Sequence, residues 1–187
     1  MKKIILASKS PRRKELLSLC GYPFEVMSKD VDESIDHTAP LDKEIEKLAI
    51  RKARAVFDDN PDCIVIGSDT IVTIDNKVLG KPHTEDNATV MLKELSGKPH
   101  QVITGVAILT QDKVISFSNT STVWFNEIDE YEIKQYVESG EPLDKAGAYG
   151  IQGKAGCFVS RIDGDYYSIM GLPLSQVYTE LRKLVVE

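Results

Sequence analysis

Apolar residues along the chain follow two recurring patterns. Unbroken apolar runs at 4–7 and 63–67 predict buried β-strands. Between these runs, apolar residues recur every three or four positions after Pro40, which predicts a helix with most of one side in the core. The positions that share this side are Leu41, Ile45, Leu48, Ala49 and Lys52. Lys52 is the charged member, and we expect it at the edge of the buried side.

The rest of the chain continues this mixture of strands and helices. Further strand patterns are found at 24–27, 71–74, 102–109, 114–125, 157–162 and 166–169. Further helix patterns start at 11, 85, 129 and after Pro173. Helices and strands intermix from end to end without a linker or repeat. The pattern therefore predicts a single α/β domain over residues 1–187, built on a mixed sheet.

The first strand leads into an unusual helix start. Ser10 is a suitable N-cap and Pro11 is a suitable first helical residue. Four cations crowd this start, although the positive end of the helix dipole favours anions there. They are Lys9, Arg12, Arg13 and Lys14. A strand end, a helix N-terminus and arginines together favour a phosphate site, and a set of solvated side chains is the alternative.

The composition narrows the classes of function. The 187 residues are 42% hydrophobic and 28% charged, which is ordinary for a globular protein with a sizeable core. A net charge of −6 argues against nucleic acid as a partner, and no apolar stretch is long enough to span a membrane. Three widely spaced cysteines, Cys20, Cys63 and Cys157, predict reduced thiols and a cytoplasmic location. An anionic substrate would therefore need local basic residues or a bound cation.

Asp69 is the most informative single residue. It ends an apolar run between Ser68 and Thr70, which we expect to place it beyond a strand's end, where α/β sheets hold ligands. Glu33, in an acidic loop at 30–36, could join Asp69 in holding a divalent cation. Two carboxylates plus substrate phosphates are a usual way of binding Mg²⁺. A carboxylate that hydrogen-bonds its own turn is the alternative interpretation.

Two later segments carry further candidate groups. Lys81 lies in a rigid Gly-Lys-Pro turn, where a fixed cation would suit a phosphate, although a solvated lysine is the alternative. The glycine-rich segment 145–154 matches neither the dinucleotide-binding nor the P-loop spacing. Its glycines permit close approach of a ligand, and Gln152 offers a donor and an acceptor that could contact a base edge. A loop that only reverses the chain is the alternative.

The residues by themselves lead to a broad class of function. Neither a GxSxG motif nor a local cysteine–histidine pair is present, so covalent catalysis has no support. Carboxylates, phosphate-binding cations and a predicted metal remain. They indicate a metal-assisted phosphoryl or nucleotidyl enzyme, or a nucleotide-binding module.

Six segments form an ordered set of motifs. They are ILASxSPRR at 5–13, Glu33, IGSDT at 66–70, GKP at 80–82, DKAGAYGIQG at 144–153 and IDGDY at 162–166. In this order they resemble the Maf family of nucleotide pyrophosphatases over essentially the whole chain. The resemblance implies an elongated, strongly twisted mixed sheet flanked by helices, with two lobes and a central cleft, as in the inosine triphosphate pyrophosphatases. It also implies a homodimer.

The resemblance implies roles for individual residues. The GAYGIQG segment at 147–153 is similar to that of the subgroup that hydrolyses dTTP, UTP and some modified pyrimidine nucleotides. That subgroup releases the monophosphate and pyrophosphate by water attack on the α-phosphorus. Asp69 would be the proton acceptor and, with Glu33, a ligand of Mg²⁺ or Mn²⁺. Base selection would fall to Arg12, Thr70 and Gln152. The remaining site positions, which would bind phosphate, are Ser8, Arg13, Lys52 and Lys81.

Two other functions stay open at this stage. The same chemistry could act on 7-methyl-GTP, the substrate of a sister subgroup. The protein could instead be a non-enzymatic, nucleotide-binding regulator of cell division, a process with which the family is also linked. The set of acids and cations favours the enzyme, because a pure binder does not need a water-activating carboxylate beside a metal.

Overall fold

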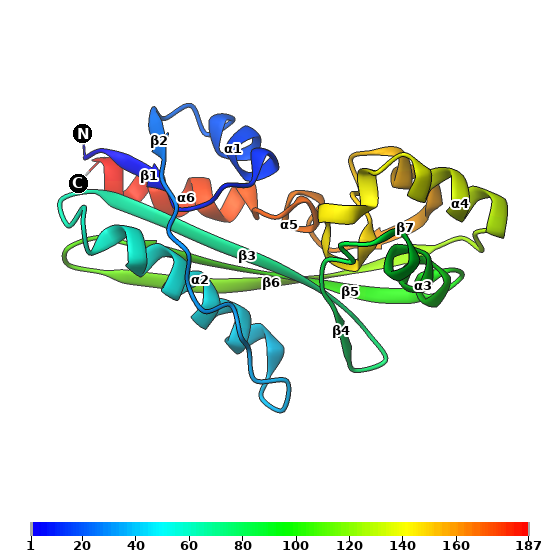
Figure 1. Cartoon of the computed structure of the whole chain (residues 1–187). Coiled ribbons are helices and arrows are strands. Elements are labelled where there is room, and N and C mark those ends of the chain that lie inside the picture. The colour runs from blue at the N-terminus through cyan, green and yellow to red at the C-terminus, as the bar shows by residue number, and fades with distance from the viewer. Residues whose placement is uncertain (1, 187) are drawn as a thin grey trace. The chain divides into compact units, whose positions relative to one another are not determined.

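The computed structural model describes residues 2–186 (Figure 1). Its strands are β1 (Ile4–Leu6), β2 (Phe24–Val26), β3 (Ile64–Ile74), β4 (Lys77–Leu79), β5 (Pro99–Leu109), β6 (Val114–Phe125) and β7 (Val159–Asp163). Its α-helices are α1 (Pro11–Ser18), α2 (Leu41–Phe57), α3 (Glu85–Leu95), α4 (Glu130–Glu138), α5 (Tyr166–Met170) and α6 (Leu174–Val186). The predicted mixed α/β class is confirmed.

The strands within the described residues form one seven-stranded mixed sheet. Their order is β2–β1–β3–β5–β6–β7, and β4 pairs with β3 outside this path. β1 runs parallel to both β2 and β3, whereas β4 runs antiparallel to β3 and β7 runs antiparallel to β6. The parallel part holds the N-terminal strands, so the first helix start and the acidic loop both follow strands of this part.

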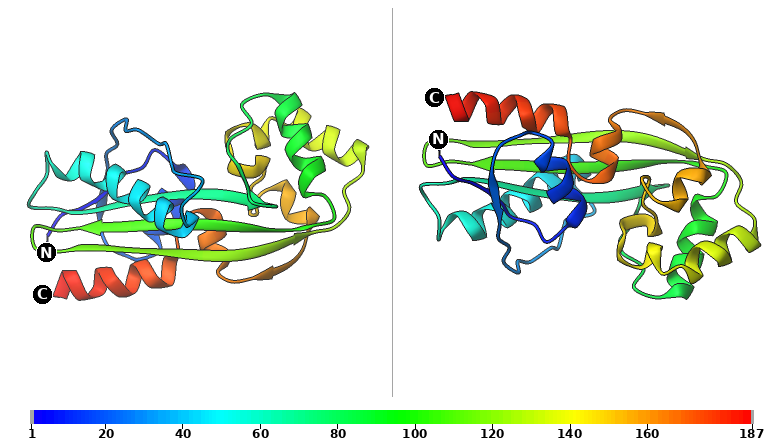
Figure 2. Two further views of the ribbon diagram at one scale, coloured as in Figure 1. Left: turned by 90° about the horizontal axis from the view of Figure 1, so that it is seen from below. Right: turned by 90° about the horizontal axis from the view of Figure 1, so that it is seen from above.

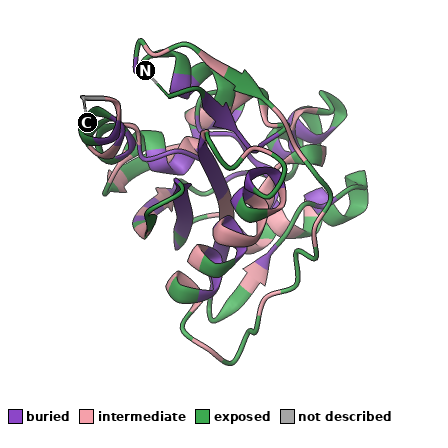
Figure 3. Ribbon diagram, turned by 90° about the vertical axis from the view of Figure 1, so that its left-hand side faces the viewer, coloured by how far each residue is buried: buried purple, intermediate pink, exposed green. Residues whose placement is uncertain are grey.

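The chain divides into two compact units. Unit 1 comprises Met1–Asp69, Thr104–Asn119 and Gly171–Glu187, and unit 2 comprises Thr70–Ile103 and Thr120–Met170. Each unit has its own apolar core, and buried residues follow the strands (Figure 3). In unit 1, α2 and α6 lie on opposite sides of the strands (Figure 2). The single domain over residues 1–187 stays a prediction.

Two glycines allow α2 to lie directly against strand backbone in unit 1. A Cβ atom on Gly67 in β3 would stand 2.8 Å from the amide nitrogen of Ala53. A Cβ atom on Gly105 in β5 would stand 2.5 Å from the carbonyl oxygen of Ile45. Such contacts are too short for any side chain, so glycine is required at both positions for the helix to come this close.

The predicted helix starts at Ser10 and Asp129 are confirmed. The Ser10 side chain accepts a hydrogen bond from the backbone of Arg13, as an N-cap does. Asp129 and Glu132 form a reciprocal capping box at the start of α4. These polar signals act over three residues, and for that reason they can be recognised in the sequence.

The strand predicted at 166–169 is wrong, because these residues form helix α5. The chain turns at Gly164, whose φ of 131° suits glycine. Asp165 then starts the helix. Its carboxylate accepts from the Tyr167 amide at 2.9 Å, and its carbonyl accepts from the Ile169 amide at 3.1 Å. The aromatic residues suggested a strand, but the aspartate cap decides the conformation.

His100 is a buried histidine in the core of unit 2. The residue is only 2% exposed, and its Nε2 lies 2.8 Å from the hydroxyl oxygen of Tyr149. Its ring meets Phe125 edge to face, with centroids 4.8 Å apart. Burial lowers the pKa of His100 from 6.5 to about 4, and the backbone of Lys98 opposes this shift. The neutral ring is therefore the form that the fold accommodates.

This burial predicts a dependence of stability on pH. The unfolded chain binds a proton at His100 below about pH 6.5, whereas the folded chain does so only near pH 4, so stability falls as the pH decreases through this window. Between pH 7 and 4, we expect the wild type to lose about 3 kcal/mol more unfolding free energy than His100→Gln. Urea unfolding at stepped pH measures this difference. His37→Gln, which alters an exposed histidine, should behave like the wild type.

Candidate functional site

Asp69 lies inside β3, which corrects its predicted place beyond a strand's end. Ile71 and Val72 extend the apolar run after it, so the strand continues to Ile74 without a break. Asp69 and Thr70 are the half-buried residues of a strand that is otherwise buried. A carboxylate in such a strand is costly unless cations or hydrogen-bond donors meet it.

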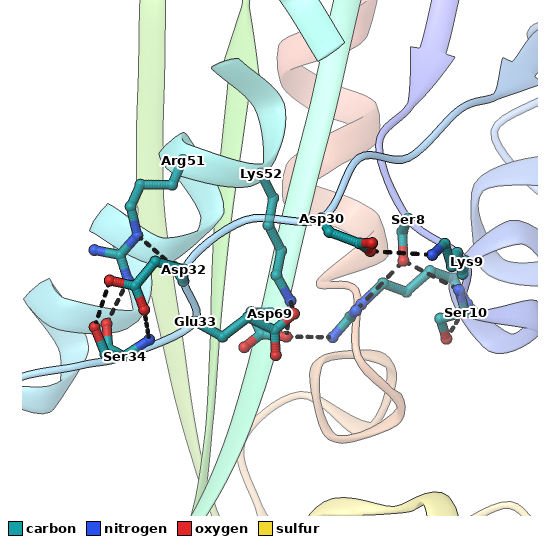
Figure 4. Close-up of polar contacts among 11 residues, drawn as sticks. Ser8, Lys9, Ser10, Asp30, Asp32, Glu33, Ser34, Arg51, Lys52 and Asp69 are labelled. Carbon is teal, nitrogen blue, oxygen red and sulfur yellow. Dashed lines mark hydrogen bonds and ion pairs between the residues drawn. The ribbon is translucent and has the colours of Figure 1, made fainter. Parts of the chain in front are cut away.

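Lys52 on α2 lies between two carboxylates (Figure 4). Its Nζ is 2.9 Å from Oδ1 of Asp69 and 2.8 Å from Oε1 of Glu33. The Lys52 and Asp69 side chains are 15% and 19% exposed, whereas that of Glu33 is 65% exposed. Lys52 follows Ala49 by about one helical turn, and Asp69 follows Gly67 by two positions of a strand. The close packing of α2 on β3 therefore sets this ion pair.

Arg13 on α1 approaches the same carboxylate. Its Nη2 lies 3.8 Å from Oδ1 of Asp69, while its Nε donates to the carbonyl of Gly171 at 2.9 Å. Its Nη1 donates to Oγ of Ser8 at 3.5 Å, and Ser68 donates to the Gly171 carbonyl at 3.0 Å. Burial lowers the pKa of Arg13, and the negative charge of Asp69 opposes that shift. The guanidinium stays charged, because an arginine pKa begins far above neutrality.

The loop that carries Glu33 is held by Arg51 (Figure 4). The Arg51 guanidinium donates to the carbonyls of Asp32 at 3.1 Å and Ser34 at 2.5 Å, on either side of Glu33. The Asp32 carboxylate accepts from the amide and hydroxyl of Ser34 at 2.9 and 2.8 Å, and these bonds hold its pKa below the usual range. Glu33 is thus presented by a braced turn, although its own side chain is largely exposed.

We call five predicted residues the Lys52 cluster, since the contacts above join them within unit 1. They are Ser8, Arg13, Glu33, Lys52 and Asp69. Arg12 also lies in unit 1, and its charge contributes to the lowered pKa of Arg13. The other predicted residues belong to unit 2, where Thr70 is half-buried and Lys81 and Gln152 are exposed.

The cations at the helix start do not act as one group. Arg13 turns to Gly171 and Asp69, as described above. Lys9 instead lies 3.2 Å from the Asp30 carboxylate on the surface (Figure 4). Acceptors from the protein therefore relieve part of the charge that the sequence concentrates there. The phosphate site at this helix start stays a prediction, and it rests on Arg13.

Sequence reasoning missed three contributors to the site. Arg51 has no motif of its own, because it binds carbonyl groups that every residue carries. Gly171 contributes a carbonyl for the same reason, and it lies 158 positions from Arg13. Ser68 is next to Asp69 in the motif, yet its buried hydroxyl donates a hydrogen bond to the carbonyl of Gly171. Only the folded chain shows these partners.

Glu33 and Asp69 fit the predicted divalent cation. Both offer carboxylate oxygens, which Mg²⁺ and Mn²⁺ prefer, and both converge on one positive charge, the ammonium of Lys52. Within residues 2–186, no group of three or more histidine, cysteine, aspartate or glutamate side chains is arranged to hold a metal. Two carboxylates supply only part of the octahedral coordination that Mg²⁺ prefers.

Among the helices of the described residues, none combines the length and the apolar character needed to cross a bilayer.

Comparisons with known proteins agree over nearly the whole chain. The model of a family described as Maf-like protein matches residues 3–184. A dTTP/UTP pyrophosphatase of Bacillus cereus (strain ATCC 10987 / NRS 248) is 53% identical over 188 residues, covering 100% of this chain and 92% of the relative. Another, from Bacillus thuringiensis subsp. konkukian (strain 97-27), is also 53% identical and is 98% covered.

One solved structure supports the fold. A HAM1 protein from Coxiella burnetii aligns with a TM-score of 0.58, covering 98% of this chain and 100% of that protein. The two sequences are 16% identical. At that identity, the likeness concerns the arrangement of strands and helices alone.

Proposed function

Because this chain belongs to the Maf-like protein family, we propose that it hydrolyses dTTP and UTP to the nucleoside monophosphate and pyrophosphate. Relatives named dTTP/UTP pyrophosphatases that match the full chain at 53% identity support this substrate class. The observation that carries the chemistry is Asp69, a carboxylate inside a buried strand that faces the ammonium of Lys52 and shares it with Glu33.

The proposed roles follow from charge and position. Asp69 accepts the proton of the water that attacks the α-phosphorus, and Glu33 and Asp69 hold Mg²⁺ or Mn²⁺. Such an ion, when bound, lowers the pKa of water and neutralises phosphate charge. Arg13 and Lys52 stabilise the negative charge that moves onto the leaving pyrophosphate, and Ser8 orients Arg13. Lys81 is a further phosphate-binding residue in the proposal.

The assay of this proposal identifies products. We expect dTTP and UTP to yield pyrophosphate without orthophosphate, and only with a divalent cation, as followed by phosphorus NMR. The same assay compares kcat/KM for the other canonical nucleotides and for 7-methyl-GTP. Orthophosphate as the sole inorganic product would contradict the reaction. Binding of nucleotides without turnover, under several metals, would favour the regulator.

Base selection is assigned in this proposal to Arg12, Thr70 and Gln152. Gln152 is exposed on the glycine-rich segment, where its amide is free to meet a base edge. We expect Gln152→Ala to lower kcat/KM for dTTP and UTP about tenfold or more relative to the other nucleotides, since a lost base contact affects only the matching base. Gln111→Ala, in the exposed β5–β6 turn, is the control. An equal loss for every nucleotide would instead indicate a structural loop.

We further propose that the protein is a homodimer and that it is located in the cytoplasm. Unit 1 exposes apolar side chains at Leu19, Val26 and Tyr178, which are 62%, 43% and 41% exposed. A groove of about 870 Å³ lies beside α1 and β2. These features support a contact surface, and sedimentation equilibrium should then give twice the 20.8 kDa of one chain. The free cysteines among the described residues support a reducing compartment.

A further inference from the structure

The Lys52 ammonium already fills the role of a cation between Glu33 and Asp69. It lies within 2.9 Å of one oxygen of each carboxylate. Arg13 adds a second positive charge 3.8 Å from Asp69. Two cations therefore face two carboxylates, and the group as a whole is neutral. In the free protein, the two carboxylates are therefore already neutralised by Lys52 and Arg13.

A divalent cation cannot simply be added to this arrangement. An ion shared by Glu33 and Asp69 would share their oxygens with an ammonium that now contacts them at 2.8 and 2.9 Å. Positive charges at such separations repel strongly, most of all where water screens them little, and the Lys52 side chain is only 15% exposed. Either the ammonium leaves the carboxylates or the divalent ion stays out.

Lys52 is a member of the cluster whose charged group can move away from the carboxylates. Asp69 is fixed in the middle of β3, and the turn around Glu33 is braced by Arg51. The lysine ammonium, in contrast, is carried by a flexible four-carbon stem. The ammonium can instead bind the phosphate chain of a nucleotide, which carries several negative charges.

We propose that Lys52 is a built-in counter-ion that holds the place of the divalent cation in the free protein and yields it when the nucleotide phosphates arrive. This inference rests on the proposed function, since it concerns how the metal and the nucleotide reach that site. Metal and nucleotide then bind as a coupled pair. Each raises the affinity for the other by the same factor, as thermodynamic linkage requires.

The test measures binding of Mn²⁺ alone, without nucleotide, by electron paramagnetic resonance of the free ion. Lys52→Met removes the charge and keeps most of the side-chain volume. We expect the Kd for Mn²⁺ to fall at least tenfold in this variant, even though its turnover is impaired. Lys52→Gln repeats the measurement with a neutral polar side chain and replaces Lys52→Met if that protein does not fold.

Two matched variants separate competition from a general change of charge. Lys47→Met removes another lysine of α2, which is 62% exposed and pairs with Glu44, and it should keep the wild-type Kd. Lys52→Arg keeps a positive charge in place and should also bind Mn²⁺ as weakly as the wild type. Adding Glu33→Gln to Lys52→Met should abolish the gain, because it removes one of the two carboxylates.

A second measurement adds α,β-imido-dTTP, which resists cleavage at the scissile bond. We expect this analogue to tighten Mn²⁺ binding at least tenfold in the wild type, after correction for the complex in solution, and to do so less in Lys52→Met. A folded Lys52→Met protein that binds Mn²⁺ no better than the wild type would overturn the inference. The hydrolysis assay decides the proposed function separately, because the Kd comparison requires no turnover.

Discussion

Replacing Asp69 with asparagine should lower the rate of pyrophosphate release from dTTP and UTP by roughly 10² to 10⁴-fold, the range associated with loss of a general base. The amide has the shape of the carboxylate but cannot take a proton from water, and it is a poor partner for a divalent cation. Lys52 would keep Glu33 as a partner at 2.8 Å, so the local fold should survive. Steady-state kinetics with direct detection of pyrophosphate measures the change.

The control for this variant is an aspartate outside the Lys52 cluster. Asp112→Asn alters an exposed residue in the turn between β5 and β6 and should leave the rate unchanged. Thermal unfolding of both variants verifies that any loss of rate is not a loss of folded protein. Turnover near the wild-type rate in Asp69→Asn would remove Asp69 from the proposed role.

A second large effect is expected from a single methyl group. Gly67→Ala places a Cβ 2.8 Å from the amide nitrogen of Ala53, and α2 can relieve this contact only by moving away from β3. Such overpacking against backbone should lower the unfolding free energy by about 3 kcal/mol. Because α2 also carries Lys52, the same movement should weaken the contact with Asp69 and reduce turnover at temperatures where the protein is still folded.

Gly80→Ala provides the matched comparison for stability. A Cβ at Gly80 meets nothing within 4 Å, and the residue does not need a positive φ. Its unfolding free energy should change by less than about 0.5 kcal/mol, as for most open sites. Urea unfolding of the two variants side by side measures the contrast, and equal stabilities would show that α2 does not depend on the missing side chain.

The parts of the fold that could be predicted from the sequence are those specified by neighbouring residues. Ser10 and Asp129 act on amides three positions away, so their helix starts could be recognised. The segment 166–169 shows the limit of this approach. Its aromatic residues resemble a strand, and its helical conformation depends on Asp165 and on a turn at Gly164. Where two local signals compete, the sequence does not reveal which prevails.

The candidate site likewise contains residues that could be predicted from the sequence and residues that could not. Asp69 and Glu33 could be selected from the ordered motifs, whereas Lys52 stood only at the edge of a predicted helix side and was assigned through the family resemblance. The structure brings these three residues into contact. The groups that hold them could not be selected. Arg51 and Gly171 act through backbone carbonyls, which are the same at every position of any sequence. Nor could the pattern show that Lys52 would meet both acids rather than solvent.

The hydrogen bond between Arg13 and the Gly171 carbonyl also bears on folding during synthesis of the chain. Unit 1 is assembled from three stretches of chain, the last of which begins at Gly171. During synthesis, Arg13 and Asp69 leave the ribosome before the stretch that begins at Gly171, so their unit stays incomplete until that stretch has followed. The intervening stretch Thr70–Ile103 emerges long before that point. The nascent chain therefore carries the acidic and basic groups of its site before the Gly171 carbonyl that binds Arg13 has been made.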